Sequence, residues 1–238
     1  MNEKDRKILI VGGGKVGSHA LQYCRDNNFA AIVVDENIDC YVRPEVDFIE
    51  NNDIFKVIRD IEKGESALVI INLKELINII DTFVFDYIIP AIPVHLLGKL
   101  TIDFFLNKNI KIKPSMDLIQ KIQPNLDPTI ICSNNDEEGI IVASYMPAGI
   151  KCAPNCIENI ICPITKIEKP KPLFEIFQDA CMDFPSKILQ SKQLIPNLGG
   201  FPTESIKEFL DFLYSVNNNF LIGTSCMCHG IINAFEIK

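Results

Sequence analysis

Short apolar runs alternate with amphipathic segments over the first half of the chain. Four apolar runs predict strands: 7–12, 30–35, 67–71 and 86–89. The run 67–71 is almost wholly apolar, as expected of a strand that is buried on both faces. Four segments with apolar residues at helical spacing predict helices: 15–27, 53–63, 74–82 and 94–107. Residues 46–49 and 110–112 predict short further strands, the latter closing the series. This alternation predicts an α/β fold with a doubly wound parallel sheet.

The pattern changes after about residue 114, where prolines become frequent. Residues 129–132 and 140–145 predict two strands joined by a polar turn, and a helix is predicted over 204–216. We therefore expect a domain boundary near residue 127, followed by a smaller mixed α/β domain over 128–238.

A glycine cluster directly follows the first predicted strand. Gly12, Gly14 and Gly17 have the spacing G-x-G-x-x-G. In a strand–turn–helix context the first glycine allows the tight turn, the second lets the backbone approach a pyrophosphate, and the third lets the helix pack on the sheet. The helix N-terminus would offer free N–H groups to the phosphates. We expect a dinucleotide to contact the whole segment: Gly12, Gly13, Gly14, Lys15, Val16 and Gly17.

Asp35 ends the second predicted strand, 18 residues after Gly17. An acid at this place hydrogen-bonds the ribose hydroxyls of NAD and would repel the 2′-phosphate of NADP, so NAD is the expected cofactor. The stretch 8–35 resembles the Rossmann NAD(P)-binding superfamily. The wording Val-Gly-Gly-Gly-Lys-Val is similar to two of its branches, the siroheme-pathway precorrin dehydrogenases and the regulatory nucleotide-binding domains of potassium channels. The resemblance covers about the first half of the chain and implies a Rossmann domain over 1–127.

Two further polar residues follow predicted strands of the sheet. Ligands of open parallel sheets bind outside the carboxyl ends of the strands. Asn72 follows the fourth strand, and His95 follows the fifth, in the first turn of the next predicted helix. The helix dipole there favours a neutral imidazole, so His95 is a candidate proton donor or acceptor beside the nicotinamide. The alternative is a histidine that is satisfied by a backbone group.

Composition and charge exclude several classes of function. Apolar residues make up 47% of the 238 residues and the net charge is −8, with no basic stripe, so nucleic acid is not an expected partner. No apolar run approaches the ~18 residues that span a bilayer. The N-terminus has mixed charge and leads directly into the first strand, unlike a secretory signal. We expect a cytoplasmic protein that does not bind membranes.

Five of the nine cysteines and one histidine form two clusters. The clustered residues are Cys152, Cys156, Cys162, Cys226, Cys228 and His229. Disulfides do not persist in the cytoplasm, whereas converging thiolates and an imidazole are ligands of soft metals or iron–sulfur clusters. The spacing matches neither a ferredoxin nor the C-x2–4-C knuckles of structural zinc. An iron–sulfur cluster, structural zinc, a redox-active Cys226–Cys228 pair and a coincidence of composition all stay open.

Together these features predict an NAD-binding redox protein that couples the dinucleotide to a cysteine-held metal or iron–sulfur centre. One alternative is a regulatory module that senses NAD and carries structural zinc. Another, indicated only by the glycine-loop wording, is a tetrapyrrole or metal-insertion enzyme. A small-molecule substrate or a redox partner is expected, and the sequence leaves room for a homodimer.

Overall fold

The computed structural model describes residues 6–51, 53–147, 149–150 and 160–238. Within these residues the chain forms two compact units. The N-terminal unit runs to Leu96 and also includes Leu198–Lys207. The C-terminal unit comprises Leu97–Asn197 and Glu208–Lys238.

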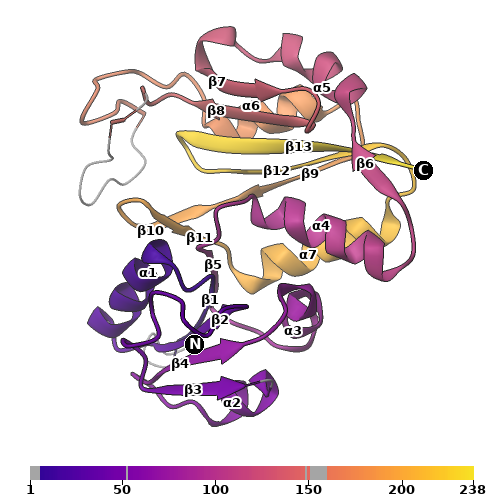
Figure 1. Ribbon diagram of the computed structural model, residues 1–238. Helices are drawn as coiled ribbons and strands as arrows, with labels where there is room; N and C mark the ends of the chain where they lie inside the picture. The colour runs from indigo at the N-terminus through magenta and orange to yellow at the C-terminus, as the bar shows by residue number, and fades with distance from the viewer. Residues whose placement is uncertain (1–5, 52, 148, 151–159) are drawn as a thin grey trace. The chain divides into compact units, whose positions relative to one another are not determined.

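Five parallel strands form the sheet of the N-terminal unit (Figure 1), in the order β3-β4-β2-β1-β5. They are β1 (Lys7–Val11), β2 (Ala30–Asp35), β3 (Phe48–Asn51), β4 (Ser66–Ile70) and β5 (Tyr87–Pro90). The central strands are buried almost throughout, which explains their unbroken apolar sequence. In the sheet, β2 pairs with one edge of β1 and β5 pairs with its other edge. This Rossmann-like order confirms the predicted α/β fold and makes β1 the point where the strand order reverses.

Helices connect these strands at the predicted places. They are α1 (Lys15–Asp26), α2 (Ile54–Asp60), η1 (Leu73–Glu75) and α3 (Leu76–Thr82). α1 packs against β1 and β2. Its buried residues recur at helical spacing and so lie on one face: Gly17, Ala20, Leu21 and Cys24. The carboxylate of Asp53 caps α2 by accepting the Lys56 N–H at 2.9 Å. α1 and α2 therefore begin within one residue of their predicted starts, whereas the helix predicted over 74–82 is divided into η1 and α3.

Residues 198–207 return to the N-terminal unit. β11 (Leu198–Gly200) contacts β5, and the Thr203 hydroxyl donates to the Phe85 carbonyl at 2.6 Å while it accepts the Phe85 N–H at 2.9 Å. Thr203 is fully buried, so these two bonds satisfy its hydroxyl. They explain why this unit is assembled from two separate segments.

A six-stranded mixed sheet forms the C-terminal unit. Its strands are β6 (Ile112–Pro114), β7 (Ile131–Asn135), β8 (Ile140–Ser144), β9 (Ser186–Gln190), β12 (Phe220–Ser225) and β13 (His229–Ile237). The order is β7-β8-β13-β12-β9, with β6 also paired to β13, and only β12 and β9 run parallel. This confirms the predicted mixed α/β unit, which contains several cysteines.

Neighbouring residues of β12 and β13 point to opposite faces of that sheet, and helices cover both faces. Leu221 and Ala234 lie in a core with α5 (Met116–Ile122) and α6 (Leu173–Cys181). Phe220 and Phe235 stack on the other face beside α4 (Leu96–Asn107) and α7 (Thr203–Ser215), which lie side by side (Figure 1). The remaining short elements are η2 (Gln123–Asn125), η3 (Pro128–Ile130) and β10 (Lys192–Ile195).

The division after Leu96 differs from the boundary predicted near residue 127, and β6 explains the difference. The sequence predicts that residues 110–112 close the parallel sheet, and this prediction is wrong because β6 pairs antiparallel with β13. α5 buries its apolar face in the core of the same unit. The segment 97–127 therefore belongs to the C-terminal unit.

Candidate functional site

The glycine loop leaves β1 at the point where the strand order of the N-terminal sheet reverses. Gly12 has φ +110°, and a Cβ on it would lie 2.7 Å from the Ala91 carbonyl oxygen. A Cβ on Gly17 would lie 2.2 Å from the Gly12 carbonyl oxygen. Both glycines are therefore required by the fold, the first by its backbone angles and the close approach of residue 91, the second by the packing of α1 on the turn.

Gly14 has no such structural reason to be glycine. It has φ −77° and ψ −164°, which any residue can adopt, and a Cβ on it would meet no atom of the described residues within 4 Å. Gly14, Lys15 and Val16 are exposed at the N-terminus of α1. The open backbone here, at a helix N-terminus, suits the close approach of an anionic ligand.

Asp35 lies against the glycine loop. Its Oδ2 accepts the Gly13 N–H at 2.6 Å, and its Oδ1 accepts the Asn37 N–H at 2.8 Å. These two hydrogen bonds hold the loop in place. Asp35 is half-buried, so part of it stays exposed to solvent. The structure thus brings together the predicted glycine loop and the predicted ribose-binding acid.

The segment that follows β2 covers the glycine loop, which the sequence pattern did not predict. A Cβ on Gly13 would lie 2.5 Å from Cys40 Sγ, and the Val42 N–H donates to the Gly13 carbonyl at 3.0 Å. Burial, and then the negative charge of Asp35, raise the pKa of Cys40. The Ser18 hydroxyl donates to Glu45 at 2.8 Å. No local sequence signal marks these contacts, because the segment has neither helical nor strand periodicity.

Asn72 and His95 both follow strands of the sheet, as predicted. The Asn72 side chain accepts the Lys74 N–H at 3.0 Å and so caps η1. His95 is half-buried and directly precedes α4, which begins at Leu96, so it does not lie in the first helical turn as predicted. Asn72 therefore has a structural role of its own, and His95 stays a candidate by its position.

Sulfur atoms from three segments meet in the C-terminal unit. Met146, Cys162 and Cys228 are buried in one cluster, and Cys226 and Met227 pack against it; we call these five residues the sulfur cluster. Cys162 Sγ lies 3.5 Å from Met146 Sδ. The structure therefore brings together Cys162 and the cysteines near the C-terminus. The predicted ligands Cys152 and Cys156 lie outside the described residues.

Two cysteines of the sulfur cluster accept hydrogen bonds from the backbone that follows them. Cys226 Sγ accepts the N–H groups of Cys228 and His229, both at 3.4 Å. Cys162 Sγ accepts the N–H of Thr165 at 3.4 Å. Burial raises the pKa of Cys162, but hydrogen bonds from Thr165 and the positive charge of Lys169 outweigh it, so the net pKa is lowered. N–H···S bonds favour thiolates, the form that binds metals.

Backbone pairing sets the positions of these sulfurs. The Cys162 N–H donates to the Ile167 carbonyl and the Lys169 N–H donates to the Ile160 carbonyl, so residues 160–169 form a small hairpin. The turn 226–229 closes with the Cys226 N–H on the His229 carbonyl at 2.9 Å. Cysteines on tight turns can direct their sulfurs to one place, as thiolate sites require.

Lys169 is buried beside the sulfur cluster, with 2% of its surface exposed. Its Nζ lies 3.2 Å from Cys228 Sγ. Partial burial of the ring, together with the charge of Lys169, lowers the pKa of His229. Sequence reasoning missed this lysine because lysines are usually exposed.

His229 Nδ1 lies 3.7 Å from Cys226 Sγ. Among the described residues, no group of three or more histidine, cysteine, aspartate or glutamate side chains is arranged to hold a metal ion. The part of the chain that the structure describes therefore provides hydrogen-bonded thiols and a buried cation but not a complete ligand set.

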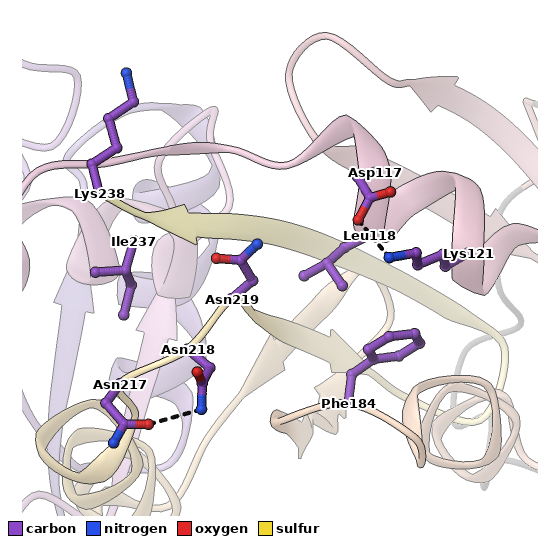
Figure 2. A pocket seen from close by; sticks show the side chains of 9 residues that line it. All are labelled: Asp117, Leu118, Lys121, Phe184, Asn217, Asn218, Asn219, Ile237 and Lys238. Atoms are coloured by element: carbon purple, nitrogen blue, oxygen red, sulfur yellow. Dashed lines mark hydrogen bonds and ion pairs between the residues drawn. The ribbon is translucent and has the colours of Figure 1, made fainter.

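A separate pocket of about 620 Å³ lies in the same unit, between α5 and the turn that precedes β12 (Figure 2). Figure 2 shows the Lys121–Asp117 ion pair (2.7 Å) at its rim and the Asn218 amide bound to Asn217 (2.9 Å). These polar groups pair with one another rather than converge on the pocket, and none belongs to the sulfur cluster.

No helix among the described residues is long and apolar enough to cross a membrane.

Comparisons with known proteins match both parts of the chain. Residues 8–96 match the family AF_1314_N, described as an uncharacterized protein, N-terminal domain, and residues 101–238 match AF_1314_C, described as an uncharacterized protein, C-terminal domain. A relative from Archaeoglobus fulgidus, described as an uncharacterized protein, is 28% identical over 231 residues, covering 96% of this chain and 98% of the relative. No solved structure matches. The junction of the two matched regions agrees with the division after Leu96.

Proposed function

This chain belongs to the AF_1314_C family, whose domain covers residues 101–238, and we propose that it is an NAD-binding redox protein. In this proposal the N-terminal unit is a Rossmann NAD(P)-binding domain. The C-terminal unit holds a metal or iron–sulfur centre on the sulfur cluster.

The observation that carries the nucleotide proposal is the difference between the three motif glycines. Gly12 and Gly17 are glycines because the fold requires it, whereas Gly14 faces open space with ordinary backbone angles. A diphosphate that approaches the backbone at the N-terminus of α1 gives Gly14 a reason to lack a side chain. The loop also follows the strand at which the sheet order reverses, where ligands of such sheets bind.

Asp35 favours NAD over NADP in this proposal. Its carboxylate lies at the edge of the glycine loop and is only half-buried, so it can accept ribose hydroxyls while it holds the Gly13 N–H. A 2′-phosphate at the same place would meet a like charge. Bound NAD would supply two-electron hydride chemistry, and His95 is the proposed proton donor or acceptor.

The thiols of the sulfur cluster are of the chemical type that binds soft metals, and the described residues supply only part of a ligand set. Cys162, Cys226 and Cys228 supply thiols, two of which accept backbone N–H groups, and Lys169 Nζ lies 3.2 Å from the third. Thiolates select zinc, copper(I) and iron–sulfur clusters. We propose that Cys152 or Cys156 completes the ligand set, with His229 as the alternative donor. An iron–sulfur centre would add one-electron transfer to the chemistry of the chain.

Two measurements on the full-length protein test the proposal. Anaerobic purification followed by iron, zinc and acid-labile sulfide assays should give iron and sulfide in whole-number ratio to protein, with broad visible absorption. Calorimetric titration should show binding of NAD or NADH. A protein that contains neither metal nor sulfide would contradict the proposed metal centre, and a protein that binds no nucleotide would contradict the proposed NAD site.

The turns at Cys162 and Cys226 also suit structural zinc, which favours a second candidate function. The chain would then be a regulatory module that senses NAD without turning it over. One zinc per chain, no colour and no sulfide would select this candidate.

A further inference from the structure

We propose that Glu45 is a specificity-determining residue of the nucleotide site in the N-terminal unit. Its negative charge selects dinucleotides such as NAD, whose bridging diphosphate carries about two charges, against ADP and ATP, whose terminal phosphates carry more. This inference rests on the nucleotide part of the proposed function. It assigns a role to a residue that belongs to no motif in the sequence.

The carboxylate of Glu45 is attached to the beginning of α1. The Ser18 hydroxyl donates to its two oxygens, at 2.8 Å and 2.9 Å. The Ser18 N–H donates to the Gly14 carbonyl at 2.9 Å, so Ser18 lies one helical turn after Gly14 on the same face of the helix. Because side chains of a helix lean toward its N-terminus, this hydroxyl holds the carboxylate close to the open backbone at Gly14.

The backbone that carries Glu45 is fixed on the glycine loop. Val42 is fully buried, and its N–H donates to the Gly13 carbonyl at 3.0 Å. The Glu45 N–H donates in turn to the Val42 carbonyl at 2.8 Å. Since both the backbone and the side chain of Glu45 are held, its charge cannot move away from an anion at the loop without the loss of these bonds.

The charges around the glycine loop are mainly negative. Residues 35–47 contain five carboxylates and one arginine, Arg43, which is itself paired with an aspartate. The exposed Lys15, at the first position of α1, adds one positive charge to the partial charge of the helix N-terminus. These positive groups attract a diphosphate, whereas Asp35 and Glu45, bound at the two ends of the loop, repel additional negative charge.

Asp35 and Glu45 discriminate at different parts of the ligand. In the proposed complex Asp35 meets the ribose, so it acts on a 2′-phosphate, whereas Glu45 lies beside the diphosphate. A charge held about one helical turn, ~5 Å, from the phosphates interacts with them strongly at low salt and less as salt screens it. The preference that Glu45 imposes should therefore depend on the number of phosphate charges and on salt.

The test measures the affinity of full-length wild-type protein and Glu45→Gln for NAD, ADP-ribose, ADP and ATP, by calorimetry at low salt without divalent cations. The last three ligands share adenosine and differ mainly in phosphate charge. Wild type should bind NAD and ADP-ribose more tightly than ADP, and ADP more tightly than ATP. Glutamine keeps an oxygen for the Ser18 hydroxyl but removes the charge, so the preference for NAD over ATP should fall about threefold or more.

Glu65→Gln is the matched control for the loss of one charge. Glu65 is also half-buried, and its carboxylate also accepts a hydrogen bond, from the Glu62 N–H at 2.8 Å. It directly precedes β4 and so lies at the edge of the parallel sheet opposite to the glycine loop. This variant should keep the wild-type preference, and circular dichroism verifies that both variants are folded.

Salt gives a second readout that needs no variant, because the wild-type preference for NAD over ATP should decrease as the salt concentration rises. A preference that is independent of salt, an unchanged preference in Glu45→Gln, or the same change in Glu65→Gln would overturn the inference alone. So would a wild-type protein that binds ATP as tightly as NAD. A wild-type protein that binds no NAD would overturn the nucleotide part of the proposed function, and the role of Glu45 with it.

Discussion

The backbone N–H of Gly13 donates to Asp35 Oδ2 across 2.6 Å and joins the glycine loop to the end of β2. The same carboxylate accepts the Asn37 N–H, so it orders the loop on both sides. The carboxylate that would hydrogen-bond the ribose in the proposed complex, Asp35, is thus already held in place by backbone N–H groups. Such pre-ordering lowers the entropic cost of binding.

Replacing Gly12 by alanine should destabilise the N-terminal unit. The added Cβ would lie 2.7 Å from the Ala91 carbonyl oxygen at φ +110°. We expect a loss of about 2 kcal/mol or more in the free energy of unfolding, measured by urea denaturation. Gly14→Ala is the matched control, because its angles suit alanine and should leave stability unchanged or raise it by about 0.4–1 kcal/mol. Equal losses in both variants would show that the loop geometry is wrong.

Asp35→Asn should relax the preference for NAD. The amide keeps an oxygen that can accept the Gly13 N–H, but it no longer repels a 2′-phosphate. We expect the ratio of NAD to NADP affinity to fall at least tenfold, measured by calorimetry. Glu36→Gln, on the next and more exposed residue, should leave the ratio unchanged. A wild-type protein that binds both nucleotides equally would already refute the assignment.

Gly230→Ala should disturb the turn that carries Cys226 and Cys228. The new Cβ would lie 2.5 Å from Phe177 Cε2 and 2.7 Å from Ser225 Oγ. Overpacking of this kind costs about 1–3 kcal/mol. Adding Phe177→Leu removes the ring and should recover part of the stability, as a double-mutant cycle can measure. Strict additivity of the two single changes would argue against the contact.

Stability should fall at alkaline pH because of two buried thiols. Burial raises the pKa of Cys24 and of Cys181 from 9.0 to about 12. Between these values the unfolded chain loses protons that the folded chain keeps. The contribution of each thiol is therefore full below pH 9 and is lost as the pH rises, by about 1.4 kcal/mol per pH unit.

Urea denaturation at pH 8, 9 and 10 tests this dependence. The double variant Cys24→Ala with Cys181→Ala should have a shallower alkaline decline than wild type, after correction for its lower stability at pH 8. Cys132→Ala, at an exposed thiol, should keep the wild-type slope. Identical slopes in all three proteins would contradict the burial argument.

The parallel sheet could be predicted from the sequence because its signals are local. Ile8–Val11 and Ala30–Val34 are unbroken apolar runs that are buried on both faces. The glycine loop between them is equally local, so its turn and helix start were predictable. What the loop binds stays a prediction.

The boundary between the units could not be predicted because it depends on distant pairing. Ile112 pairs with Ile237 and Pro114 with Phe235, more than 120 residues away. Three residues of strand give no periodicity that would assign them to one sheet or the other. Only the partner strand decides which unit contains the segment.

The sulfur cluster was predictable in part. Clustered cysteines indicated that Cys162, Cys226 and Cys228 could meet, and the structure brings them together. Lys169 could not be predicted, because the sequence Glu-Lys-Pro-Lys-Pro does not distinguish it from exposed Lys171. Its burial depends on the fold of the 160–169 hairpin against the 226–229 turn.

Calorimetric titration of NAD into wild-type protein and Gly14→Ala most directly tests the central claim that the glycine loop seats a dinucleotide. Since neither the backbone nor the packing requires glycine at this position, Gly14→Ala should unfold like wild type yet bind NAD at least tenfold more weakly. His19→Ala, on the exposed side of α1, should bind as wild type. Wild-type affinity in Gly14→Ala, or no binding by any of the three proteins, would contradict the claim.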